Sequence, residues 1–148
     1  MRERISDPDP LRRSSGSGSA VLAGAAYFAL IFPVAFLLGV LRTLVLVPLT
    51  GELVAVALEV PVLLALAWGL ARRLGRPVPA TAGARAAMGG IAFALLMVAE
   101  LALAVLILDM PPMAFLAGMA TAPGLPGLAG QIAFGLIPLV QLRYPARS

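Results

Sequence analysis

Apolar residues along this chain gather in four long runs, and short polar segments separate the runs. Each run is about 20 residues long or more, which is the length an α-helix needs to cross roughly 30 Å of hydrocarbon. Lipid offers no partner for backbone N–H and C=O groups, so such runs fold as helices that satisfy those groups internally. The pattern predicts an all-α, polytopic membrane protein, a bundle of four transmembrane helices at about residues 20–47, 52–71, 86–108 and 128–142.

The segments between the runs contain residues that end helices. Residues 48–51 (P-L-T-G) predict a turn, and residues 72–85 predict a polar loop with four Arg. Asp109 and the two Pro that follow close the third run. Residues 113–127 are too short an apolar stretch to span a membrane and contain A-P-G-L-P-G. We expect a short interfacial or re-entrant segment there, before the fourth helix, with one long broken helix as the alternative.

The two ends of the chain are polar. Residues 1–19 contain four Arg, two Asp-Pro pairs and the run S-S-G-S-G-S, a composition that cannot build a core. We therefore expect a disordered cytoplasmic tail at 1–19, a transmembrane domain at 20–142 and a cytoplasmic tail at 143–148.

Composition narrows the chemistry available to the protein. Of the 148 residues, 61% are hydrophobic and 12% are charged. Cys and His are absent, which removes thiolate nucleophiles and the usual zinc and haem ligands. Ser occurs only near the two ends, so the apolar runs carry no serine nucleophile. We expect no enzymatic activity, no cofactor and no metal site.

The basic residues predict how the chain is oriented in the membrane. All of them are Arg, and the net charge is +4. Four Arg lie in the N-terminal tail, four in the loop 72–85 and two in the C-terminal tail, all on one side of a four-span chain. Because Arg-rich segments stay on the cytoplasmic side, both termini are expected to be cytoplasmic, in a bacterial inner membrane. Arg flanking apolar runs indicates a lipid bilayer as the partner and no nucleic acid.

Four polar side chains interrupt the apolar runs at similar depth. A charged residue inside a membrane span costs about 2.5–3.5 kcal/mol on insertion scales, so such residues face partners or water. Counting from the predicted turns places all four in the outer half of the bilayer, one on each helix. The expected intramembrane cluster is Arg42, Glu59, Glu100 and Gln131, with Glu52 and Asp109 as interfacial acids at the ends of runs.

Small residues repeat on the predicted helices, and small residues let membrane helices approach closely. On the third helix they recur every four residues. Others flank the polar positions on the first and fourth helices. The predicted packing residues are Gly39, Ala82, Ala86, Gly90, Ala94, Gly127 and Gly135.

The polar cluster has a structural and a functional interpretation. In the first, Arg42 pairs with Glu59 or Glu100, and Gln131 completes a satisfied interhelical network. In the second, one Arg leaves one of the two carboxyls uncompensated, and that carboxyl takes up a proton or a cation from the outer face.

A resemblance supports treating these residues as one set. Residues 33–65 contain Arg42, Gly51-Glu52 and Glu59-x-Pro61. This pattern resembles a family of small, uncharacterised four-span bacterial inner-membrane proteins. The resemblance implies a four-span topology and carries no activity.

Two functions and a weaker third follow from these features. The first is a structural or accessory subunit of a membrane assembly, as a homo-oligomer or in a larger complex. The alternative is a small proton-coupled transporter or ion-conducting protein that uses Glu59 and Glu100. The third is lipid or hydrophobe binding by the segment Met113 to Pro126.

Overall fold

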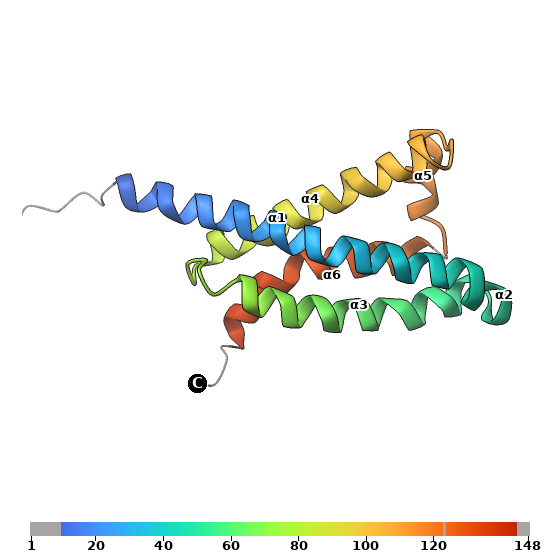
Figure 1. Ribbon diagram of the computed structural model, residues 1–148, viewed down its shortest axis with the longest axis horizontal. Helices are drawn as coiled ribbons and strands as arrows, with labels where there is room; N and C mark the ends of the chain where they lie inside the picture. The colour runs from blue at the N-terminus through green and yellow to red at the C-terminus, as the bar shows by residue number, and fades with distance from the viewer. Residues whose placement is uncertain (1–9, 123, 145–148) are drawn as a thin grey trace, which may run out of the picture.

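Helices account for nearly all of the described backbone. The computed structural model describes residues 10–122 and 124–144, and these residues form no β-strand. Four helices are long and apolar enough to cross a membrane. The prediction of an all-α fold with four candidate transmembrane helices is confirmed (Figure 1).

The first membrane-length helix is longer than predicted at both ends. Helix α1 (Pro10–Leu41) continues through a π-helical turn, η1 (Arg42–Leu46), into α2 (Val47–Thr50). The predicted tail reached residue 19, but residues 10–19 are helical; residues 1–9 lie outside the described part of the chain. The predicted turn at 48–51 shrinks to Gly51, whose φ of 82° ends the helix. A side chain is strained at this positive φ, so Gly fits the break.

Helices α3 (Glu52–Leu74) and α4 (Ala82–Leu106) are the second and third spans. The Thr81 hydroxyl caps α4, since it accepts the backbone N–H of Ala84 at 3.3 Å. Glu52 lies in the first turn of α3, and Arg72 and Arg73 lie in its last turn. These charges complement the helix dipole at both ends and help to fix where α3 begins and ends.

The segment before the last span, predicted as interfacial or re-entrant, forms a short helix. Helix α5 (Pro112–Met119) lies at one end of the bundle and connects α4 to α6 (Gly124–Val140) (Figure 1). Helix α6 starts four residues before the predicted position. Pro126 does not interrupt it, because the backbone N–H groups of a first helical turn have no intrahelical acceptor and Pro lacks only that N–H. A 3-10 turn, η2 (Gln141–Arg143), ends the last span. Residues 145–148 of the predicted C-terminal tail lie outside the described residues.

The four long helices pack as a ring in the order α1, α4, α6, α3. Helices α1 and α4 run in one direction, and α3 and α6 run in the other (Figure 1). Both ends of the described chain lie at the same end of the bundle, opposite α2 and α5 (Figure 1). The loop between α3 and α4 lies at the same end as the chain ends. The two ends of the bundle are therefore built from different segments.

The best-packed core joins α1, α4 and α6. Tyr27 is fully buried, its ring stacks on Phe134 at 4.4 Å between centroids, and its hydroxyl donates to the Phe134 carbonyl at 3.3 Å. Met88 of α4 is also fully buried. Gly89 of α4 faces the backbone of Gly135 on α6 so closely that no side chain fits between them. These contacts form the core on the side of the bundle nearer the chain ends.

The outer surface of the bundle is apolar. Many large hydrophobic side chains are more than a third exposed, from Leu22 on α1 to Leu136 on α6. Apolar faces of this extent are stable against lipid tails and unstable in water. The surface therefore fits the membrane environment that the helix lengths indicate.

Candidate functional site

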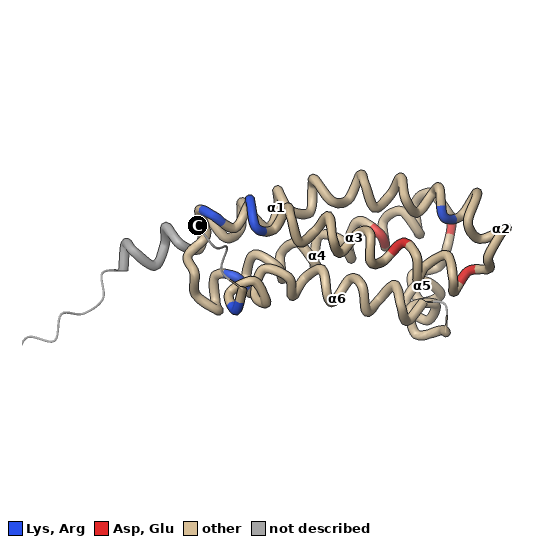
Figure 2. The backbone as a smooth tube through the Cα atoms, turned by 90° about the horizontal axis from the view of Figure 1, so that it is seen from below, with Lys and Arg blue, Asp and Glu red and all other residues tan. Residues whose placement is uncertain are grey.

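Charged residues divide between the two ends of the bundle. Figure 2 shows the described acidic residues in the half that carries α2 and α5, together with one Arg. The other described Arg lie at the opposite end (Figure 2). The Arg that lies among the acids is Arg42, on the first helix, next to Glu59 of α3.

Arg42 and Glu59 form the one side-chain ion pair among the described residues. The Arg42 Nε lies 2.6 Å from Glu59 Oε2, and the two side chains are 27% and 11% exposed. The Nε–H bond is not aligned on the carboxylate for a hydrogen bond, so the contact is an ion pair. Of the two acids that the sequence offered as partners of Arg42, Glu59 is the one in contact.

Glu100 and Gln131 form a second pair, between α4 and α6. The Gln131 Nε2 donates to Glu100 Oε2 at 2.5 Å, in a partly buried position. The predicted cluster therefore exists as two pairs, and each of the four membrane-length helices contributes one member. Glu100 has a neutral amide as its partner where Glu59 has a guanidinium.

Both pairs lie in the half of the bundle that carries α2 and α5 (Figure 2). We call these four residues the polar layer: Arg42, Glu59, Glu100 and Gln131. The layer contains two carboxyl groups and one guanidinium, so with every group ionised it carries a net charge of −1. The Gln131 Oε1 is buried and has no hydrogen-bond donor among the described residues. The layer thus contains one buried acceptor, Gln131 Oε1, and one buried donor, Arg42 Nε, without a hydrogen-bond partner in the described part of the chain.

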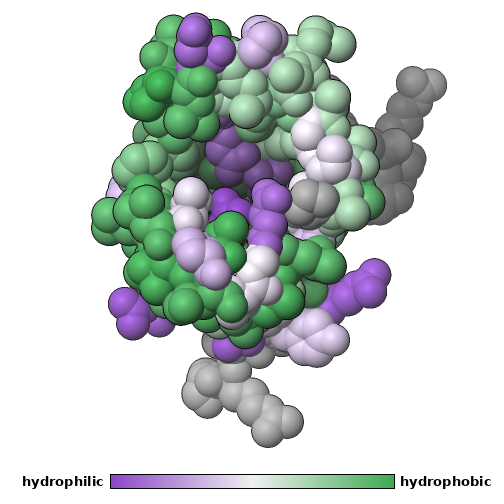
Figure 3. Space-filling view, turned by 90° about the vertical axis from the view of Figure 1, so that its right-hand side faces the viewer, coloured by the Kyte–Doolittle hydropathy of each residue, from purple (hydrophilic) through white to green (hydrophobic). Residues whose placement is uncertain are grey.

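The end of the bundle above this layer is hollowed. Figure 3 looks onto the end that carries α2 and α5, and hydrophilic side chains are visible inside the hollow, with hydrophobic ones around them. Half-buried Arg42 and Glu59 belong to this half of the bundle. Polar groups at the base of an opening are hydrated at lower cost than groups sealed in lipid.

The two predicted interfacial acids lie at helix boundaries and outside the pairs. Glu52 is exposed at the first position of α3. Asp109 is exposed just after α4, with a φ of 50° that Asp tolerates better than most residues. Neither side chain has an ion-pair partner among the described residues. Both positions agree with the ends of spans that the sequence predicted.

The predicted packing residues have mixed outcomes. Gly39 lies beside the Glu59 carboxylate, and Gly135 contacts α4, as expected. Gly127 has open space where a side chain would stand, so it makes no close contact with another helix. The predicted packing face on α4 does not pack within the described chain, because all four of its residues are exposed: Ala82, Ala86, Gly90 and Ala94. Its contact with another chain stays a prediction. The buried face of α4 is a different one and contains Met88, Gly89, Ala92 and Leu96.

Three residues that make hydrogen bonds or close helix contacts were not predicted. The Thr43 hydroxyl donates to the Gly39 carbonyl at 2.9 Å, next to the ion pair. Gly89 makes the close approach that the prediction gave to Gly90. Buried Gln141 donates to the Trp68 carbonyl at 2.7 Å and ties α3 to the end of α6. A polar residue late in an apolar run was the available signal for Gln141, and the Gly-Gly step was the signal for Gly89.

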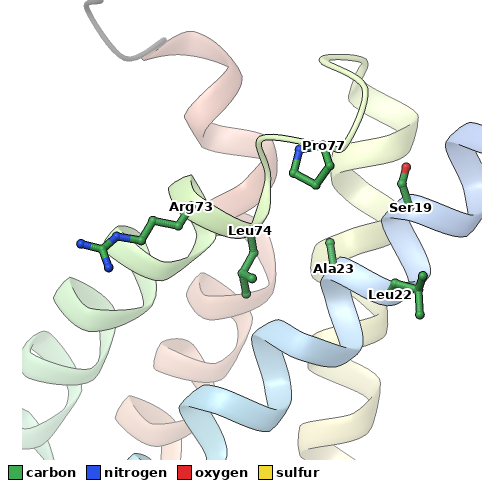
Figure 4. A pocket seen from close by; sticks show the side chains of 6 residues that line it. All are labelled: Ser19, Leu22, Ala23, Arg73, Leu74 and Pro77. Atoms are coloured by element: carbon green, nitrogen blue, oxygen red, sulfur yellow. The ribbon is translucent and has the colours of Figure 1, made fainter.

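A shallow apolar pocket of about 370 Å³ lies at the opposite end of the bundle, between α1 and the end of α3 (Figure 4). Arg73 lines it with its stem and directs its guanidinium away from the pocket (Figure 4). No set of charged groups converges there, so the pocket adds no chemistry. The remaining lining residues are Ser19, Leu22, Ala23, Leu74 and Pro77.

No protein-family model, curated protein or solved structure matches this chain. The resemblance to a four-span bacterial family therefore stays a prediction. The candidate site is defined by its own geometry, as the polar layer below the hollow.

Proposed function

We propose that the protein is a small membrane protein that takes up a proton or a small cation at Glu100 and conducts or transports it. The observation that carries this proposal is the hollow with hydrophilic side chains at its base, in the half of the bundle that holds the polar layer (Figure 3). The proposed activity is non-enzymatic, since it needs a binding carboxyl and a path and no reactive nucleophile.

The charge balance of the layer supports Glu100 as the uptake site. Arg42 is engaged by Glu59, and the Gln131 amide leaves the Glu100 charge uncompensated. A proton or a small cation restores neutrality, and the unpartnered Gln131 Oε1 is an additional acceptor. Ionisable residues within membrane spans are commonly proton or ion sites for this reason.

Proton flux into liposomes that contain the purified protein tests the proposal. We expect Glu100→Gln to reduce flux at least tenfold, because the amide keeps the shape and removes the titratable group. Glu52→Gln is the matched control, since Glu52 is an exposed carboxylate at the helix end, and should retain wild-type flux. Full flux in the Glu100 variant contradicts the proposal.

A second candidate function is that of an accessory subunit, as a homo-oligomer or in a larger assembly. The small-residue face of α4 supports it: Gly90 and its neighbours at four-residue spacing are exposed on the bundle and have no helix of the chain against them. Small residues on an exposed membrane helix suit close contact with another helix.

Cysteine cross-linking tests the accessory function, and the chain has no native Cys to interfere. We expect Gly90→Cys to form a disulfide-linked complex in native membranes. Ala92→Cys, two residues away and fully buried in the bundle, is the control that should stay unlinked. If neither variant cross-links, the small-residue face is covered by lipid.

We also propose a bacterial inner membrane as the location, with both chain ends cytoplasmic. The support is the gathering of Arg72, Arg73, Arg76, Arg85 and Arg143 at one end, and of Glu52 and Asp109 at the other (Figure 2). The polar layer then opens to the periplasmic side.

A further inference from the structure

The first membrane helix stores one extra residue next to the ion pair. In η1 the backbone N–H of Val47 bonds to the Arg42 carbonyl, five residues back, where a regular α-helix bonds four residues back. A π-turn of this kind holds one more residue than the α-helical turn it replaces. Arg42, which contacts Glu59, is its first residue.

Pro48 contributes to this turn but does not account for it. Pro48 follows η1 closely and lacks the N–H that the Leu44 carbonyl would accept in an α-helix, so a wider turn before it relieves that position. Pro33 and Pro61 are also internal to helices, yet α1 and α3 remain regular around them. A second influence must hold the extra residue at η1.

The Arg42–Glu59 pair lies where it can hold this residue. The hairpin turns at Gly51 alone, and nine residue steps separate Arg42 from Gly51 while eight separate Gly51 from Glu59. Storing one residue in η1 makes the two arms of the hairpin equivalent in length. The Glu59 carboxylate then lies beside both Arg42 and Gly39, with Oε1 3.9 Å from the position of a Cβ on Gly39.

We propose that Arg42 and Glu59 are positioning residues that lock the extra residue into η1, and that breaking the pair releases it into regular α-helix. Release advances α2 by one helical step relative to α1, a rotation of about 100° with a rise of about 1.5 Å. Helix α2 lies at the hollowed end of the bundle, so the release reshapes the entrance to the polar layer (Figures 1 and 3). That this motion gates the site rests on the proposed function, whereas the rotation of α2 itself does not.

The direction of the rotation gives a specific expectation for two neighbouring positions. Leu46 and Val47 are half-buried, and Pro48 is exposed. One step forward moves Val47 to the angular position that Pro48 now has, and Leu46 to that of Val47. Val47 therefore becomes exposed on release, while Leu46 remains half-buried.

Thiol labelling of single-Cys variants in detergent tests the proposal. We expect Glu59→Gln to increase the labelling rate of Val47→Cys by N-ethylmaleimide at least fivefold, with little change at Leu46→Cys. The matched control uses the same pair of Cys variants in a chain from which exposed Val45 is deleted. That chain has no extra residue to release, so Glu59→Gln should not increase its labelling rate. The exchanged pair, Arg42→Glu with Glu59→Arg, should restore slow labelling.

Two results overturn the proposal. One is unchanged labelling of Val47→Cys in the Glu59→Gln chain. The other is an equal increase with and without Val45, which would mean general loosening of the bundle. Labelling does not depend on Glu100. The expected labelling rates together with no flux of protons or small cations would therefore overturn only the proposed function.

Discussion

Glu59 and Glu100 are the same residue type at similar depth, but their neighbours give them different properties. Glu59 contacts a guanidinium, so its charge is balanced within the protein. Glu100 accepts from an amide, which donates one hydrogen bond without supplying a charge. An ion pair of the first kind favours fixed structure, and the second arrangement leaves a carboxyl free to exchange its charge.

Gly89 shows how much a single position on α4 matters. A Cβ on Gly89 would collide with the carbonyl oxygen of Gly135, whereas a Cβ on Gly90 would meet open space. We expect Gly89→Ala to lower the free energy of unfolding by about 1–3 kcal/mol, as overpacking does. Gly90→Ala should leave stability unchanged or raise it by up to about 1 kcal/mol through helix propensity. Unfolding in mixed micelles measures both, and equal effects would contradict this packing.

At the scale of elements, the sequence predicted the helices better than their ends and faces. Pro48 and Thr50 are turn signals in water, but a lipid-embedded chain continues its helix to keep backbone groups bonded, so the break shrinks to Gly51. The Thr50 hydroxyl donates to the Leu46 carbonyl at 2.9 Å and helps to satisfy the backbone there.

The members of the polar layer were predictable, and their pairing was not. Counting residues from a turn gives the height of a side chain in a membrane helix and says little about its rotation around the axis. The same limit explains α4, whose inner and outer faces are both apolar, so small residues every four positions do not reveal which face is buried. The π-turn had no signal beyond Pro48.

At the scale of the whole molecule, the separation of charge between the two ends supports the proposed orientation of the bundle. Arg-rich ends usually stay cytoplasmic, so in this orientation the end with Glu52 and Asp109 faces outward. The hollow in Figure 3 belongs to the acidic end, so it opens outward in this orientation.

Labelling of intact cells tests that orientation. Asp109→Cys and Ala80→Cys place single thiols at exposed positions at opposite ends of the bundle. We expect a membrane-impermeant maleimide to label Asp109→Cys in intact cells, and Ala80→Cys only after lysis. The reverse pattern would place the hollow on the cytoplasmic side.

The one-residue link at Gly51 has a consequence for how the protein is made. We expect a hairpin with so short a link to enter the bilayer as a unit, with Arg42 and Glu59 already opposite each other. Entering separately, each charge would face a cost of about 2.5–3.5 kcal/mol. Entering together, they would cross as a neutral pair, and we expect the first half of the chain to be stable in the membrane before α4 and α6 are synthesised.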